Sequence, residues 1–202
     1  PGSGGGKTRT PDGGPKVDLN EGDLTSLDGK LEKVVDSDLA KFIILCRQVR
    51  QVAPDSAKGK VVSLKKIELD LNTRARYQFV SVLDLLGAAV EVRANDEART
   101  RRTVRSPLKA SRRTIRDTLP VLLDYVSIGS EPVIRGRVNL LEAPEEVLTA
   151  VPGMTEGIAR RIATQGRAAS GGSDESRRHP TWLLADGLVD LEQMKKLLPY
   201  VT

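Results

Sequence analysis

The chain has 202 residues, with 32 Lys+Arg against 27 Asp+Glu and a formal net charge of +5. This length suffices for one ordinary domain or two small ones with a hydrophobic core, so neither a disulfide-stapled miniprotein nor a largely unfolded chain is expected. Aromatic residues make up only 3% of the sequence, which argues against an RRM-type or OB-type platform on which single-stranded bases stack. The single cysteine and the single histidine disfavour both a structural zinc site and a Ser-His-Asp triad.

The N-terminal part of the sequence predicts a leader followed by two helices. Residues 1–16 are rich in Gly, Pro, Ser, Thr and charged residues, a composition typical of a flexible leader. Apolar residues then recur at helical spacing from Val17 onward and predict two short helices with a break near residues 34–36. Turn-forming residues predict a loop over 53–60, and partial alternation predicts an extended segment over 61–71.

The middle of the chain predicts a buried helix, a strand and a loop. Closely spaced apolar residues over 77–86 predict a buried helix that Gly87 ends. A short strand is expected over 88–93. Residues 93–116 hold many arginines and few apolar residues, so a long solvated loop is expected there, and its charge is interpreted as solvation rather than as a grip on phosphates or lipid headgroups.

Two helical segments and a loop are predicted after this region. Apolar residues from Ile115 to Val126 predict a helix with Pro120 in its first turn. Residues 168–179 have the composition of a Gly/Ser/Arg loop. The closing segment 182–201 predicts two short helices on either side of a break at residues 186–187.

An internal repeat organises these elements. Residues 17–22 correspond to 138–143, and further positions align as follows: Leu27 with Leu148, residues 34–36 with 153–155, Leu39-Ala40 with Ile158-Ala159, and Ile43 with Ile162. Each copy predicts an initial strand-like stretch, a helix, a tight turn and a second helix whose small Ala permits close helix crossing. The predicted fold is therefore mainly α with minor β (α+β), built from two helix-hairpin-helix (SAM-like) units.

The second copy carries the clearer local signals. Pro144 suits the first helical position, and Glu145 and Glu146 place negative charge where the helix dipole favours it. Pro152-Gly153 stops this helix, and Thr155 is a suitable N-cap for the next. The predicted organisation is a leader (1–16), a first unit with an insertion of short strands and an Arg-rich loop (17–136), and a second unit with closing helices (137–202).

The run from Val138 to Thr155 resembles the signature of the general secretion pathway protein K family, the minor pseudopilins of type II secretion systems. Residues 197–202 are similar to the stretch by which that family's α-helical domain leads back to its pilin sheet. The resemblance covers residues 136–202, and 17–48 more loosely. It implies a non-enzymatic periplasmic domain at the tip of a pseudopilus, with other minor pseudopilins as partners. It also implies an inner-membrane anchor through an N-terminal helix that this sequence does not include.

The same run also resembles the helix-hairpin-helix motifs of competence and DNA-repair proteins, so DNA binding is the alternative. Such hairpins typically carry Gly-apolar-Gly, which leaves backbone N–H groups free for a phosphate. This chain has Gly153-Met154-Thr155, and a Thr oxygen at that N-cap occupies such amides. Arg160 and Arg161 are the candidate phosphate contacts under this alternative.

The candidate interaction surface is the hairpin itself. Its residues are Pro152, Gly153, Met154, Thr155 and Gly157. Turn chemistry alone also explains Pro152 and Gly153, so a plain helix connection is the competing interpretation. No catalytic residue is predicted, because the sequence shows no set of acid, base and nucleophile.

No metal or other cofactor site is assigned. The family resemblance raises the question of calcium, for which the acidic residues of the first copy are the candidates: Asp18, Glu21 and Asp23. They lack the alternating oxygen ligands and closing Glu of an EF-hand loop. We expect His179 to be an exposed loop residue without an acidic partner, Trp182 to anchor the last helices, and Cys46 to be a small buried hydrophobe.

Overall fold

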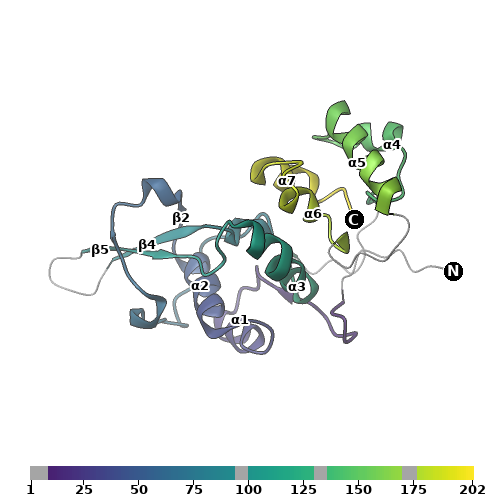
Figure 1. Ribbon diagram of the computed structural model, residues 1–202. Coiled ribbons are helices and arrows are strands. Elements are labelled where there is room, and N and C mark those ends of the chain that lie inside the picture. Colours follow the sequence, from purple (N-terminus) through teal and green to yellow (C-terminus); the bar gives the residue numbers. More distant parts are fainter. Residues whose placement is uncertain (1–8, 94–99, 130–135, 170–176) are drawn as a thin grey trace. The chain divides into compact units, whose positions relative to one another are not determined.

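The structure, a computed structural model, describes residues 9–93, 100–129, 136–169 and 177–202 (Figure 1). It is mixed α/β, with seven α-helices and two small sheets in this part of the chain. The chain divides into two compact units. The first, here called the sheet unit, comprises residues 15–110 and 125–130, and the second, the helical unit, comprises residues 1–14, 111–124 and 131–202.

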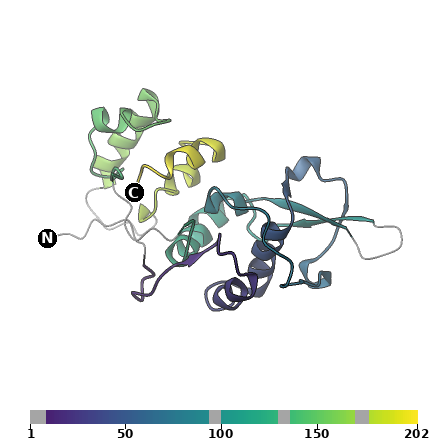
Figure 2. The same ribbon diagram turned by 180° about the vertical axis from the view of Figure 1, so that it is seen from behind.

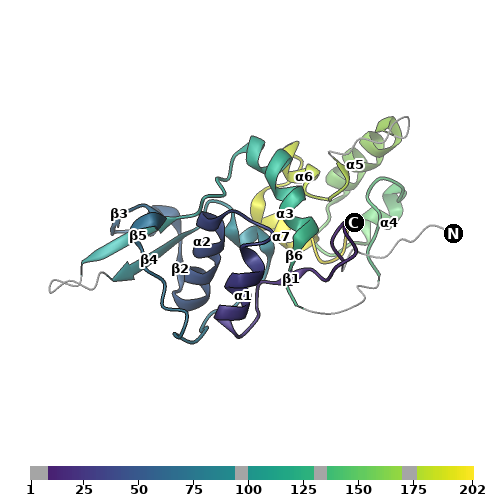
Figure 3. The same ribbon diagram turned by 90° about the horizontal axis from the view of Figure 1, so that it is seen from below.

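The sheet unit combines two helices with six short strands. Its elements are β1 (Val17–Asp18), α1 (Leu24–Leu31), α2 (Ser37–Gln48), β2 (Gln51–Val52), β3 (Lys60–Val61), β4 (Ala89–Arg93), β5 (Arg101–Arg105) and β6 (Val126–Ser127). Strands β2, β4, β5 and β3 form one sheet in that order, while β1 and β6 pair in parallel as a second. Figure 3 shows the β1–β6 pair beside α1.

Helices α1 and α2 match the predicted pair with its break near residues 34–36. The Asp23 side chain caps α1 by accepting the N–H groups of Thr25 and Ser26, and the Asp36 side chain caps α2 by accepting the N–H of Leu39 at 2.9 Å. The two helices pack against each other (Figure 1). Large apolar side chains of the two helices are completely buried: Leu27, Leu31, Phe42, Ile43 and Ile44. Local caps and apolar spacing therefore suffice to define this pair.

The predicted helix over 77–86 is wrong. Only a four-residue 3₁₀ turn forms there, Val82–Leu85. The preceding backbone is held by distant groups, because the Asn20 side chain accepts the N–H of Phe79 at 2.8 Å and donates to its carbonyl at 2.9 Å. The N–H groups of Arg76 and Tyr77 both donate to the carbonyl of Arg47. A helix would need these backbone groups for its own bonds.

The strand over 88–93 is confirmed as β4, but two neighbouring predictions are wrong. Residues 61–71 are mostly irregular, with a 3₁₀ turn at Leu64–Lys66. The supposed Arg-rich loop contains β5, which pairs antiparallel with β4. Its Thr103 and Val104 are both buried, and the arginines that flank them concealed this short strand in the sequence. The predicted loop at residues 94–99 lies outside the described residues.

In its described residues, the helical unit contains a π-helical turn and five α-helices. These are the turn Thr114–Thr118 and the helices α3 (Leu119–Tyr125), α4 (Glu145–Thr149), α5 (Glu156–Ala169), α6 (Trp182–Ala185) and α7 (Leu191–Leu197). The predicted helix around Pro120 and the two closing helices are confirmed. Val138 forms a parallel bridge with Val201. Trp182 is buried as expected.

The predicted leader over 1–16 and the predicted loop over 168–179 lie only partly within the described residues. Within the leader, the N–H of Gly14 donates to the hydroxyl oxygen of Thr10 at 3.0 Å, which closes a turn in residues 9–14. The leader prediction for residues 1–8 and the loop prediction for residues 170–176 lie outside the described residues. Across the residues that are described, we find no helix whose length and apolar character would let it cross a membrane.

Cys46 is buried in α2 and is expected to be unreactive in the folded chain. Burial raises the pKa of its thiol from 9.0 to about 12, so at mildly alkaline pH the reactive thiolate is scarce. Because the folded-state pKa is the higher one, the thiol's contribution to stability is complete below pH 9.0 and is lost as the pH rises towards about 12. An aromatic disulfide reagent should label Cys46 in concentrated urea but hardly at all in native buffer. Equal labelling rates would contradict this.

Gly59 should tolerate no side chain. A Cβ atom at this position would lie 2.8 Å from the backbone of Arg101, because the chain before β3 passes close to β5. We expect Gly59→Ala to lower the free energy of unfolding by about 1–3 kcal/mol, the usual effect of overpacking. In contrast, Gly29→Ala, in α1 with open space around it, should raise it by about 0.5–1 kcal/mol. Urea unfolding followed by circular dichroism measures both, and equal effects would refute the steric argument.

Candidate functional site

Helices α4 and α5 and the turn between them bring together the predicted interaction residues. Pro144 precedes α4, and Glu145 and Glu146 occupy its first turn. The N–H of Met154 donates to the carbonyl of Val151 at 3.0 Å, and Gly153 has a φ of +85°, a conformation that glycine adopts without strain. The two helices pack against each other, and Figure 2 shows the pair from behind.

The outer side of this turn is open to solvent. Pro152, Gly153, Thr155 and Gly157 are exposed, whereas Met154 is half-buried. A Cβ atom on Gly153 would lie 3.6 Å from the Cβ of Lys196 on α7, so the inner side of the turn rests on that helix. A Cβ atom on Gly157 would meet nothing within 4 Å. The turn therefore both connects two helices and presents a surface.

The charged and polar groups of the hairpin are largely engaged within it. The Nε of Arg160 lies 3.2 Å from a carboxylate oxygen of Glu145 and donates to it. The hydroxyl oxygen of Thr155 accepts the N–H of Ile158 at 3.4 Å, as expected for an N-cap. Arg161 is exposed and forms no ion pair among the described residues. One of the two candidate phosphate contacts is thus already paired with a carboxylate.

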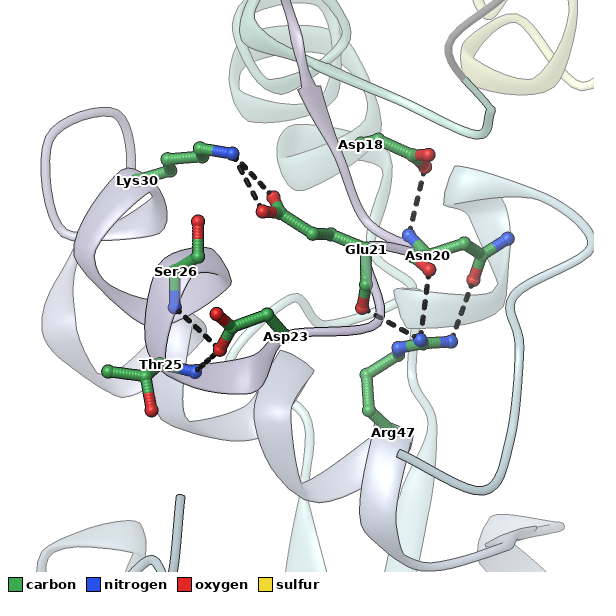
Figure 4. Close-up of polar contacts among 8 residues, drawn as sticks. All are labelled: Asp18, Asn20, Glu21, Asp23, Thr25, Ser26, Lys30 and Arg47. Atoms are coloured by element: carbon green, nitrogen blue, oxygen red, sulfur yellow. Dashed lines mark hydrogen bonds and ion pairs between the residues drawn. The ribbon is translucent and has the colours of Figure 1, made fainter. Parts of the chain in front are cut away.

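A second polar centre, which the sequence did not indicate, is built around Arg47 in α2. This side chain is 2% exposed, and its guanidinium donates to the backbone carbonyls of Asn20, Glu21 and Tyr77 and to the side-chain oxygen of Asn20. Figure 4 shows the guanidinium between α2 and the segment that leads into α1. Its Nε is buried without a partner among the described residues. Burial lowers the pKa of Arg47 from its ordinary value.

The acidic residues of the first copy serve separate purposes (Figure 4). Asp18 accepts the N–H of Asn20 at 2.9 Å, Glu21 pairs with Lys30 at 2.7 Å, and Asp23 caps α1. In the described part of the chain, no three His, Cys, Asp or Glu side chains gather closely enough to hold a metal ion. The structure therefore gives these residues local structural roles.

A third cluster corrects the prediction for His179. The carboxylate of Asp124 in α3 is 3% exposed, and it accepts a hydrogen bond from Arg178 and lies 3.0 Å from the Nε2 of His179. The histidine side chain is only 13% exposed, so it is neither exposed nor without an acidic partner. Next to it, the guanidinium of Arg177 lies 4.7 Å from the ring centroid of Trp182. The buried carboxylate of Asp124 is thus paired with a cation, as buried charges usually are.

Comparison of the chain with protein-family models, curated proteins and solved structures finds no match.

Proposed function

We propose that this chain is a non-enzymatic protein-interaction module, the soluble α-domain of a minor pseudopilin at the tip of a type II secretion pseudopilus, acting in the periplasm. The observation that carries the proposal is the turn between α4 and α5. It has an exposed outer side, its neighbouring Arg160 is paired within the hairpin, and it lies in the segment whose sequence resembles the protein K family. Its partners would be other minor pseudopilins.

Matching local geometry in the two sequence copies supports the proposed helix-hairpin-helix repeat. Val17 pairs in parallel with Val126, and Val138 bridges in parallel to Val201. Two residues further, the N–H of Leu19 donates to the carbonyl of Ser127 at 3.0 Å, and the N–H of Leu140 donates to that of Thr202 at 3.0 Å. If the two sequence segments were alike only by chance, the same parallel strand pairing would not be expected at both Val17 and Val138.

The helical parts of the two copies also agree. Asp36 accepts the N–H of the residue three positions later, and Thr155 does the same. Four aligned apolar pairs are buried to nearly the same extent, at 1% exposure or less: Leu19 and Leu140, Leu27 and Leu148, Ala40 and Ala159, and Ile43 and Ile162. The pair Leu39 and Ile158 differs, since Leu39 is buried and Ile158 is half-buried. These agreements support the proposed internal repeat.

A binding experiment with a matched pair of variants tests the docking surface. The full chain is titrated calorimetrically with purified soluble domains of minor pseudopilins from the same organism. Gly157→Gln adds a side chain on the open side of the hairpin and should weaken binding at least tenfold. Gly29→Gln makes the same change on α1, where space is also open, and should leave binding unchanged. No complex with any of these domains, or equal weakening by both variants, would contradict the proposal.

DNA binding remains the alternative, and the exposed side chain of Arg161 is the observation that favours it. The test is an anisotropy titration of a labelled duplex at low salt. DNA binding predicts an affinity that falls steeply as salt is added, because phosphate contacts release counterions, and that is lost in the double variant Arg160→Ala/Arg161→Ala. Absence of binding at low salt would dispose of this alternative.

A further inference from the structure

A pocket in the sheet unit lies next to the buried Arg47. Its volume is about 480 Å³, a size that admits a small molecule. The lining residues come from the segment before α1, from α2 and from the irregular stretch 74–78, which overlaps the wrongly predicted helix only at residues 77–78. They are Asn20, Gly22, Arg47, Arg74, Ala75, Arg76, Tyr77 and Gln78.

The pocket lining carries only positive charge. It contains three arginines and no carboxylate. Arg74 and Arg76 are exposed, and neither forms an ion pair with any described residue. Arg47 donates only to neutral oxygens. The carboxylate of Asp18 acts on the charge of Arg47, but it lies outside the pocket lining. It accepts hydrogen bonds from backbone N–H groups. A cleft lined by one sign of charge concentrates the electric field and attracts ions of the opposite sign.

The lining segment is also held in place before any ligand arrives. The N–H groups of Arg76 and Tyr77 donate to the carbonyl of Arg47 at 2.7 and 3.1 Å, and the guanidinium of Arg47 donates to the carbonyl of Tyr77. The backbone that carries Arg74 and Arg76 is thus bonded to α2 in two ways, through the backbone carbonyl and through the guanidinium of Arg47. Such anchoring lowers the entropic cost of ordering a binding loop.

We propose that this pocket binds the phosphate monoester group of a small molecule. Each guanidinium presents a planar fork of donors that matches two oxygens of an anion. A carboxylate has one charge and two oxygens, which one arginine satisfies. A phosphate monoester has close to two charges and three terminal oxygens, so it can engage Arg74 and Arg76 together, and the half-exposed Tyr77 lies beside them for the organic part of the ligand.

Calorimetric titration of the full chain with phenyl phosphate, inorganic phosphate and acetate at equal ionic strength tests this proposal. Both phosphates should bind at least tenfold more tightly than acetate. Arg74→Gln/Arg76→Gln should weaken phosphate binding at least tenfold, whereas Arg105→Gln, an exposed arginine on β5 outside the pocket, should change it less than twofold. Because all three side chains are exposed, the variants should fold normally, which thermal unfolding checks.

The titrations also distinguish two sources of the phosphate group. Tighter binding of phenyl phosphate than of a peptide bearing phosphoserine supports the small molecule, whereas a peptide that binds tenfold more tightly than phenyl phosphate overturns that part of the proposal. Acetate binding equal to phosphate, or a double variant that binds phosphate like the unaltered chain, overturns the site itself. Neither result bears on the hairpin, since binding of pseudopilin domains is measured separately.

Discussion

Replacing Arg47 with alanine is expected to lower the free energy of unfolding by about 3 kcal/mol. The reason is that buried carbonyl oxygens would lose the charged guanidinium that donates hydrogen bonds to them. The guanidinium donates to three backbone carbonyls and one side-chain amide oxygen. These acceptors belong to residues 20–21 and 77, which lie outside any helix or strand. Its removal therefore frees both the segment before α1 and the segment that contains Tyr77. Urea unfolding followed by circular dichroism gives the change.

Arg50 provides the control for this experiment. It follows α2 by two residues and is exposed, so Arg50→Ala should change the free energy of unfolding by less than about 0.5 kcal/mol. Arg47→Met separates packing from hydrogen bonding, since methionine fills space but donates nothing. It should lose most of the same stability. A decrease below about 1 kcal/mol for Arg47→Ala would show that the carbonyls find other partners easily.

The second large effect is expected for Asp124→Ala in the helical unit. This carboxylate is almost fully buried and joins α3 to Arg178 and His179. Its removal leaves Arg178 without its counter-charge, and breaking a buried pair in this way is costly. Because the Arg178 side chain is 36% exposed and water can compensate it, we expect a loss of about 2 kcal/mol rather than the full cost of a buried charge.

Two further variants show whether Asp124 acts through these contacts. Asp124→Asn keeps an acceptor oxygen and should cost clearly less than Asp124→Ala. Asp117→Ala, at an exposed position before α3, should have an effect within about 0.5 kcal/mol of zero. Thermal or urea unfolding measures all three. If Asp124→Ala changed the free energy of unfolding no more than Asp117→Ala, the buried carboxylate would contribute nothing to the stability of the helical unit.

The sequence predicted those elements whose signals are local. Apolar spacing predicted α2, and in the α4–α5 hairpin apolar spacing, the N-cap Thr155 and the helix stop at Pro152-Gly153 agree. The structure has helices in both places. The strand β4 was found because apolar residues follow Gly87 directly. The coarse α+β class follows from these elements.

The errors arise where partners far along the chain decide the outcome. Residues 77–81 have the apolar spacing of a helix, but the backbone groups of Tyr77 and Phe79 bond to Arg47 and Asn20, which no local pattern reveals. Strand β5 depends on β4 for its pairing and is rich in arginine. His179 meets Asp124 across 55 positions of sequence, so its partner could not be seen from its own loop. Similarly, no local pattern distinguishes the buried Arg47 from an ordinary exposed cation in the last turn of a helix.

The parallel pairing of β1 with β6 has a consequence for how a nascent chain folds. Val17 meets its strand partner, Val126, only after nearly all of the sheet unit has been made. At roughly 5–20 residues per second, this early strand waits several seconds on the ribosome with an open edge that other chains could join. Such late closure is typical of slow folding, so translation speed should govern how much of the product escapes misassembly.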